Sequence, residues 1–423
     1  MIAVIGAGIS GIQAAGQLQR LGADFCVLEA SDRPGGLART AAYERWRYDF
    51  GVKALYSQNS AVMSYLKSLP VDYVVHDRQV AVYHCSAGSP GGQDISYPFE
   101  NGIGELPHED KIACVLGYFE AQSAQKPYAN FREWIMNQLG RGVAEQFMLP
   151  YNSKIWDCPL DEISPALVAG KIHPAPLEEI LRIALGERIT GRQYQARFLY
   201  PREGLNALIE AMARPVAPSI RYNFRVGRID THGAGYEIVS TAGERVACQA
   251  IISTLPLPRL GALLAPRRWR RPEWRYNNTR FLIFCLNRAP ARRLHWQFFA
   301  HPSFPFYRLT YMHNFSDRFQ PCLVAEVTDR GQPAQLNEFV EALERIGVQR
   351  DWIEAVQEER LEFTYPIPTL RSESEKPQII EAFEAQHIYP LGRAGSWLYA
   401  NIDGIIAQAW ERVPQIVARE GTL

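Results

Sequence analysis

The chain begins Met1-Ile-Ala-Val-Ile-Gly6-Ala-Gly8-Ile-Ser10-Gly11, and this stretch decides the fold class. An apolar run enters the spacing G-x-G-x-x-G, and a helical pattern follows that stops at Gly22. Strand, glycine turn and helix in this order are typical of a dinucleotide-binding unit, in which Gly6 permits the tight turn, Gly8 lets the backbone approach a pyrophosphate, and Gly11 lets the helix pack closely on the strand. The helix N-terminus adds free N–H groups and a positive dipole end for the phosphates.

A second apolar run, 24–28, ends in Glu29, eighteen residues after Gly11. A carboxylate at this position can accept hydrogen bonds from both ribose hydroxyls of an adenosine. The sequence therefore predicts a dinucleotide whose ribose carries no phosphate.

A second glycine turn lies directly behind this acid, in Glu29-Ala-Ser-Asp-Arg33-Pro-Gly35-Gly36-Leu37. A simple dehydrogenase does not require a loop of this kind behind the acid. The stretch E-x-x-x-R-x-G-G resembles the large flavoprotein class of amine oxidases, protoporphyrinogen oxidase, phytoene desaturases and UDP-galactopyranose mutase, where it lies along the pyrophosphate and ribityl chain of FAD. The resemblance implies FAD contacts for Ser10, Arg33, Gly36 and Leu37, although many members have an arginine where this chain has Leu37. No Cys or His lies in a context that signals covalent attachment, so we expect noncovalent FAD.

The C-terminal stretch Gly392-Arg393-Ala-Gly-Ser-Trp397-Leu-Tyr399-Ala-Asn401-Ile-Asp403 is similar to a motif of UDP-galactopyranose mutase and its protoporphyrinogen-oxidase-like relatives. The resemblance implies that Gly392 and Arg393 approach the flavin, and that Asn401 and Asp403 begin the helix that faces the pyrophosphate. It further implies that the stretch containing Gly51 runs under the isoalloxazine ring. In the same class a valine backbone meets the adenine, which here points to Val226 in a predicted strand 220–229.

Two other motifs resemble the substrate pocket of the same group. Phe147-Met-Leu-Pro150-Tyr151-Asn152-Ser-Lys154-Ile-Trp156 matches a helical motif that carries a Tyr, a Lys and a Trp, and Tyr307-Arg308 lies where mutase-like members place an arginine for substrate phosphate. With Tyr365-Pro366-Ile367-Pro368 the resemblance covers nearly the whole chain. The expected substrate contacts are Tyr151, Lys154, Trp156, Lys171, Tyr307 and Tyr399, and the expected catalytic residues are Lys53, Arg308 and Tyr365.

Two departures from the mutases bear on the reaction. The mutases have a histidine-containing turn where this chain has Gly51-Val52-Lys53. Lys171 takes the place of a second arginine, and a lysine keeps the positive charge but lacks the bidentate fork of a guanidinium. Lys53 is either a buried base beside the flavin or a surface lysine at the end of a strand. We therefore expect an FAD-dependent oxidoreductase that acts on a small anionic substrate (a sugar nucleotide, amine or carboxylated metabolite) by hydride transfer to flavin N5. The alternatives are a non-redox mutase that acts on a sugar nucleotide through reduced flavin, and a flavin-stabilised binding protein.

The pattern along the chain predicts an α/β protein with two domains. Residues 1–75, 198–262 and 370–423 are assigned to a discontinuous Rossmann-type FAD-binding domain of the GR2-like kind. Residues 76–197 and 263–369 are assigned to an α+β substrate-binding domain, in which a helical insertion joins an antiparallel sheet.

Composition restricts the partners of the 423-residue chain. Lys+Arg and Asp+Glu both number 45, so no basic excess favours nucleic acid, and the cluster 267–275 is interpreted as a solvated loop. Seven single Cys and nine dispersed His predict neither disulfides nor a metal site. No apolar run is long enough to span a membrane, and we expect a cytoplasmic protein with a small-molecule substrate, as a monomer or a homodimer.

Overall fold

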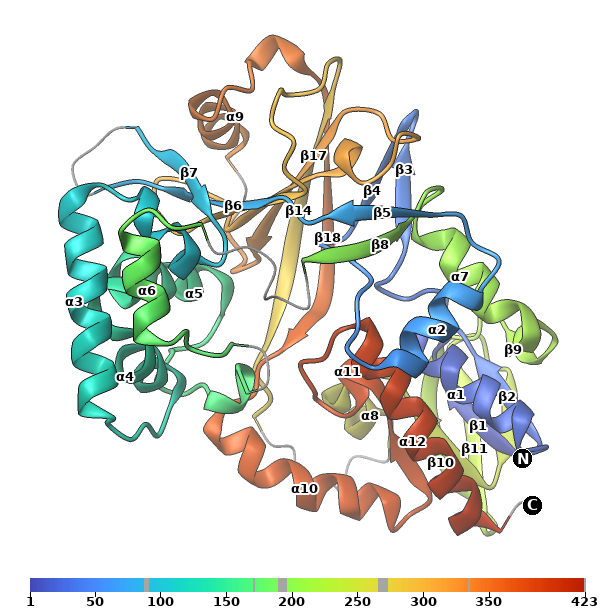
Figure 1. Ribbon diagram of the computed structural model, residues 1–423. Helices are drawn as coiled ribbons and strands as arrows, with labels where there is room; N and C mark the ends of the chain where they lie inside the picture. The colour runs from blue at the N-terminus through green and yellow to red at the C-terminus, as the bar shows by residue number, and fades with distance from the viewer. Residues whose placement is uncertain (87–90, 170–171, 189–195, 265–272, 334, 422–423) are drawn as a thin grey trace.

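The computed structural model of the chain describes residues 1–86, 91–169, 172–188, 196–264, 273–333 and 335–421 (Figure 1). Lys171 and most of the basic cluster 267–275 lie outside these ranges. Within them, no helix is both long and apolar enough to cross a lipid bilayer.

A five-stranded parallel sheet forms the nucleotide end of the molecule, in the order β19-β13-β1-β2-β9. Its strands are β1 Ile2–Ile5, β2 Phe25–Leu28, β9 Ile220–Arg221, β13 Ala250–Ser253 and β19 Ile388–Pro390. All four residues of β1 are buried because its side chains alternate between two cores: Ile2 and Val4 pack with α1 (Ile9–Arg20), and Ala3 and Ile5 pack toward the sheet β10-β11-β12. That sheet consists of β10 Val226–His232, β11 Gly235–Ser240 and β12 Arg245–Cys248.

The predicted single strand 220–229 is wrong, because β9 and β10 are separate strands in different sheets. The chain turns between them at Asn223, whose φ of 58° lies in the left-handed region that asparagine tolerates. The periodicity of apolar residues does not reveal this break.

A seven-stranded sheet forms the other half, in the order β18-β14-β17-β16-β15-β6-β7. All its neighbours are antiparallel except β6 and β15. The strands are β6 Val80–His84, β7 Gln93–Ser96, β14 Tyr276–Leu286, β15 Trp296–Phe299, β16 Arg308–Tyr311, β17 Cys322–Thr328 and β18 Ile353–Pro366. One of its faces packs against α9 (Leu336–Arg345) through Phe284, Phe306 and Phe339.

A helical insertion stands beside this sheet (left in Figure 1), and α10 (Leu370–Glu384) runs along the bottom toward the nucleotide end. The insertion contains α3 His108–Ala124, α4 Phe131–Val143, the π-helix η2 Ala144–Met148, α5 Leu149–Ile155, η3 Pro165–Leu167 and α6 Leu177–Ala184. The remaining elements are β3 Thr40–Tyr43, β4 Trp46–Asp49, α2 Ser60–Ser68, β5 Tyr73–Asp77, η1 Phe99–Glu105, β8 Arg197–Pro201, α7 Leu205–Ala213, η4 Arg214–Ser219, α8 Leu257–Leu263, η5 Met312–Asn314, η6 Arg350–Trp352, α11 Gly392–Gly395 and α12 Ile402–Glu420.

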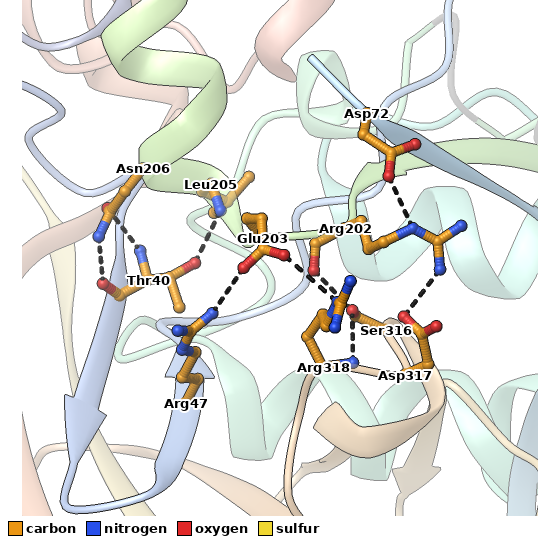
Figure 2. Close-up of polar contacts among 10 residues, drawn as sticks. All are labelled: Thr40, Arg47, Asp72, Arg202, Glu203, Leu205, Asn206, Ser316, Asp317 and Arg318. Carbon is orange, nitrogen blue, oxygen red and sulfur yellow. Dashed lines mark hydrogen bonds and ion pairs between the residues drawn. The ribbon is translucent and has the colours of Figure 1, made fainter.

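Polar contacts join segments from both halves beside β8 (Figure 2). Arg202 donates to Asp72 (2.8 Å) and to Asp317 (2.7 Å), so one guanidinium connects the start of β5 to the loop before β17. Thr40 exchanges two hydrogen bonds with Asn206 at the start of α7. Because the charged pairs are exposed, each adds at most about 1 kcal/mol, and their effect is to fix how the segments lie.

The mixed α/β architecture predicted from sequence is confirmed by the two sheets. The five-stranded sheet takes strands only from segments 1–75, 198–262 and 370–423, and the seven-stranded sheet only from 76–197 and 263–369. The domain boundaries themselves stay a prediction.

Candidate functional site

A cavity of about 1010 Å³ runs from the glycine turn after β1 into the space between the seven-stranded sheet and the helical insertion. Fourteen of the residues predicted for the site line this cavity. They are Gly6, Gly8, Ser10, Glu29, Gly36, Leu37, Lys53, Tyr151, Trp156, Arg308, Tyr365, Arg393, Tyr399 and Asn401. The fold therefore brings the expected cofactor and substrate residues into one continuous space.

The two glycine turns lie against each other at the nucleotide end. Gly6 has a φ of 98°, and a Cβ added to Gly11 would lie 1.8 Å from the carbonyl oxygen of Gly6. A Cβ on Gly36 would lie 3.4 Å from the Cα of Gly8. The bare backbone of Gly8 and Gly36 therefore forms a wall that a pyrophosphate can approach closely.

Glu29 is 7% exposed at the end of β2, and its carboxylate is held from both sides. Oε2 accepts from the N–H of Ala7 (2.7 Å), and Oε1 accepts from the N–H of Ser31 (2.8 Å). Each carboxylate oxygen has two acceptor directions, so one on each oxygen remains for a ribose hydroxyl. The backbone bonds orient the group that the sequence predicted for this role.

Glu29→Gln is expected to weaken FAD retention by about 10- to 100-fold, because a charge-assisted hydrogen bond contributes about 1.5–3 kcal/mol. An amide also has only one acceptor oxygen, so one of the two backbone N–H groups loses its partner. Fluorescence titration of the apoprotein with FAD measures the change. Asp32→Asn is the matched control, since Asp32 is exposed and pairs with Arg33 outside the cavity; equal affinities for the two variants would place Glu29 outside the ribose site.

Arg393 presents a partly buried cation to the middle of the cavity. Its guanidinium lies over the rings of Tyr365 (4.8 Å) and Tyr399 (5.1 Å), while Nε and Nη2 are buried and have no hydrogen-bond partner within the described residues. Gly392, with a φ of 82°, lets this segment approach α1 so closely that a Cβ would lie 2.0 Å from the Ser10 hydroxyl oxygen. Buried donors without an acceptor are costly, so Arg393 and the two glycine turns fit a bound group that supplies acceptors, as FAD does.

Arg308 belongs to a buried ion pair that the sequence analysis missed. Its Nε and Nη2 donate to the two oxygens of Glu326 at 2.6 Å each, and Nη2 also donates to the Tyr365 hydroxyl (3.0 Å). Glu326 has no exposed surface and lies opposite Arg308 in the pairing of β16 with β17. The signal for it was an acid inside the apolar strand 322–328, but only the register shows its partner.

Lys53 lies in the wall of the cavity and not at the surface. Its Nζ donates to the Phe50 carbonyl (2.6 Å), and a Cβ on Gly51 would lie within 3.4–3.5 Å of Lys53 Nζ, Arg308 Nη2 and Glu326 Oε2. Burial, followed by the charge of Arg393, lowers the pKa of Lys53. Three charged groups therefore converge on one glycine whose φ is 78°.

A buried carboxyl stands behind Lys53. Asp49 accepts hydrogen bonds from the hydroxyls of Thr40 (2.6 Å) and Tyr200 (2.7 Å). Burial raises the pKa of Asp49, and the two hydrogen bonds oppose that rise. The electrostatic field at Lys53 is thus set by groups on both sides of it.

The structure corrects the substrate role predicted for Lys154. Its Nζ lies 2.8–3.2 Å from the carbonyl oxygens of Phe299, His301, Phe304 and Phe306, which share its three N–H donors. Lys154 does not line the cavity. Burial lowers its pKa to about 7. Lys154 therefore holds the loop after β15, a long-range role that the sequence motif does not reveal.

Other predicted contacts also lie outside the cavity lining. Arg33 is exposed and pairs with Asp32 (3.0 Å), and Tyr307 lies behind Arg308 with its hydroxyl 3.4 Å from Glu326. Near the adenine end Arg225 lines the cavity where Val226 was expected, and Asp403 lies in the first turn of α12 just past the lining. Gly11, Gly51 and Gly392 act through their backbone, as described above.

Many lining residues were not predicted, and Arg78 and Tyr97 are two of them. Arg78 follows β5 with its guanidinium 5.5 Å from the ring of Tyr97, and both line the substrate end. Neither belongs to a motif, so no sequence signal pointed to them. Among the described residues, no three His, Cys, Asp or Glu side chains are placed to hold a metal ion.

Comparison with known proteins identifies the family. Residues 9–284 match the model of the flavin containing amine oxidoreductases. Reduced UDP-galactopyranose mutase superposes with a TM-score of 0.88 and 26% identity over 100% of this chain and 94% of its own. A protein of Exiguobacterium sp. 255-15, named as a protoporphyrinogen oxidase, has a TM-score of 0.77 and 18% identity over 99% and 98% of the two chains.

The curated relative AofH of Mycobacterium tuberculosis, named as a flavin-containing monoamine oxidase, is 26% identical over 279 residues. The match spans 63% of this chain and only 59% of that protein. Because the family model covers more than half of the sequence, the chain belongs to the flavin containing amine oxidoreductases, a family of FAD-dependent oxidoreductases.

Proposed function

We propose that the chain is an FAD-dependent oxidoreductase that oxidises a small anionic substrate and holds FAD noncovalently in a discontinuous, GR2-like Rossmann domain. The observation that carries this proposal is the single cavity that joins Gly8 and Glu29 to Arg308 and Tyr365. When bound, FAD supplies the redox chemistry by accepting a hydride at N5, and the protein supplies binding, orientation and electrostatics.

The charges of the cavity support an anionic substrate. Seven basic side chains line the cavity, against two acidic ones, Glu29 and Glu362. At the substrate end the three basic groups Lys53, Arg308 and Arg393 outnumber the two buried carboxyl groups near them, Glu326 and Asp49. A protonated amine would add a further positive charge there, so this end disfavours amines despite the name of the family.

The catalytic groups are assigned from their hydrogen bonds. Arg308 keeps Nη1 for the substrate, since Nε and Nη2 donate to Glu326 and Tyr365. The hydroxyl oxygen of Tyr365 accepts a hydrogen bond from Arg308. The hydroxyl hydrogen of Tyr365 therefore points away from Arg308, toward the cavity that Tyr365 lines. Burial raises the pKa of Tyr151 well above its usual value, so Tyr151 stays a neutral phenol beside the substrate. Burial lowers the pKa of Lys53, which favours its neutral form. In that form Lys53 is assigned the proton of the O–H or N–H group next to the carbon that gives up hydride, so that both bonds break as the C=O or C=N double bond forms.

The purified protein is expected to be yellow, and heat or acid precipitation should release FAD into the supernatant. Anaerobic addition of the substrate should bleach the oxidised flavin band. Carboxylated metabolites and sugar nucleotides are compared with amines of similar size. Recovery of no adenine dinucleotide would reject the cofactor, and bleaching by amines alone would reject the anionic substrate.

A mutase function is the second candidate. Its support is the likeness to UDP-galactopyranose mutase at 26% identity over the whole chain, together with Tyr151, Trp156, Arg308 and Tyr399 around one cavity. It would act on a sugar nucleotide through reduced flavin, so product should form only after dithionite and without net oxidation. If no substrate bleaches the flavin and no product forms after dithionite, the remaining candidate is a flavin-stabilised binding protein.

A further inference from the structure

The inner end of the cavity reaches into the helical insertion and is apolar. We name this part the insertion chamber, and its walls are Phe131, Met148, Ile155, Leu167, Val168 and Ile172. The first five are at most 8% exposed although they line a cavity, so almost none of their surface is accessible to bulk solvent. Buried spaces with apolar walls bind apolar groups in preference to water molecules, because the walls offer water few hydrogen bonds.

The backbone of the insertion chamber offers no free donors within the described residues that form it. Phe131 donates its N–H to Ile163 (2.8 Å), Leu167 to Ser164 (3.1 Å), Val168 to Pro165 (3.1 Å) and Ile172 to Val168 (3.2 Å). Met148 and Ile155 lie within helical elements.

Two polar side chains beside the chamber, Asn152 and Trp156, are hydrogen-bonded to each other. Asn152 donates to the Met148 carbonyl (2.7 Å) and accepts from the indole N–H of Trp156 (2.9 Å). The Ile155 carbonyl accepts from Thr328 (2.7 Å). A ligand with polar edges would therefore lose its hydrogen bonds to water and gain few here.

The part of the cavity between the insertion chamber and the nucleotide end is charged, with Lys53, Arg308 and Arg393 in its wall. From this division we infer that the substrate is an amphiphile, whose anionic group lies at Arg308 and whose hydrocarbon part fills the insertion chamber. The inference rests on the proposed function for the placement of the anion. The stacked rings of Phe147 and Tyr151 (5.1 Å) would also accommodate a planar base, but the polar edge of a base lacks partners deeper in the chamber.

Isothermal titration of the FAD-loaded protein with linear carboxylates, from butanoate to dodecanoate and below their micellar concentrations, tests the inference. The Kd is expected to fall about three- to fourfold per methylene until the chamber is full, because burial of one CH₂ contributes about 0.8 kcal/mol. A Kd that does not depend on chain length overturns the inference. So does uridine monophosphate, if it binds more tightly than dodecanoate and competes with it.

Leu167→Trp places an indole in the chamber and should raise the Kd of dodecanoate nearly to that of butanoate, with butanoate binding and FAD content unchanged. Leu116→Trp is the matched control, since Leu116 is 57% exposed on α3 of the same insertion and does not line the cavity. If Leu167→Trp does not fold, Val168→Thr keeps the shape and adds a hydroxyl, and should weaken only the long carboxylates by severalfold. Wild-type chain-length dependence in the folded variant overturns the inference. FAD content and bleaching test the proposed function separately, because the titration requires no turnover.

Discussion

Arg308→Ala is expected to lower the free energy of unfolding by about 3–5 kcal/mol and to abolish binding of an anionic substrate. The loss of stability follows from Glu326, which has no exposed surface and receives two hydrogen bonds from Arg308. Without the guanidinium, its carboxylate is buried with only the distant Tyr307 hydroxyl (3.4 Å) and the charge of Lys53 nearby. Thermal unfolding and substrate titration are measured on the same samples.

A double variant separates the two roles of Arg308. Arg308→Met with Glu326→Leu removes both charges, and replacement of a buried pair by apolar side chains is often neutral or stabilising. We expect it to recover stability, with the FAD content of the wild type, but not substrate affinity. Arg308→Lys should recover only part of the affinity, since it keeps the charge and loses the fork. Normal substrate affinity in the stable double variant would reject the substrate role and leave Arg308 as a structural residue.

The nucleotide end was the part that sequence could predict. Its chemistry depends on the backbone conformation of a few glycines and on one acid at the end of a strand, and these are local features with fixed spacing. Gly6, Gly8, Gly36 and Glu29 accordingly lie together in the structure.

The substrate end could be predicted only in part, because its residues interact across long sequence separations. Glu326 pairs with Arg308 only through the register of β16 and β17, and Lys154 meets its carbonyl partners about 150 positions further along the chain. A motif gives the type of a side chain but not the direction in which it points. Tyr151 and Lys154 therefore shared one motif and have different surroundings: Tyr151 lines the cavity, whereas Lys154 holds a loop.

Gly11→Ala is expected to weaken FAD binding at least about 100-fold, which corresponds to about 2.7 kcal/mol, and to lower the melting temperature. The new Cβ would lie 1.8 Å from the carbonyl oxygen of Gly6 and 3.0 Å from its carbonyl carbon. These are backbone atoms, so no side-chain rotation relieves the overlap, and α1 must move away from β1. That movement carries the N–H groups at the start of α1 away from the pyrophosphate and opens the contact between the two glycine turns.

Gly16→Ala is the matched control for this variant on the same helix. Gly16 lies within α1, and a Cβ there meets nothing within 4 Å. An alanine in a helix interior is favoured over glycine by about 0.5–1 kcal/mol, so this variant should keep FAD and gain slightly in stability. The difference between the two variants isolates the close approach of helix and strand from the general effect of a glycine substitution. If Gly11→Ala bound FAD as tightly as Gly16→Ala and melted at the same temperature, the contact between α1 and Gly6 would not be what positions the cofactor.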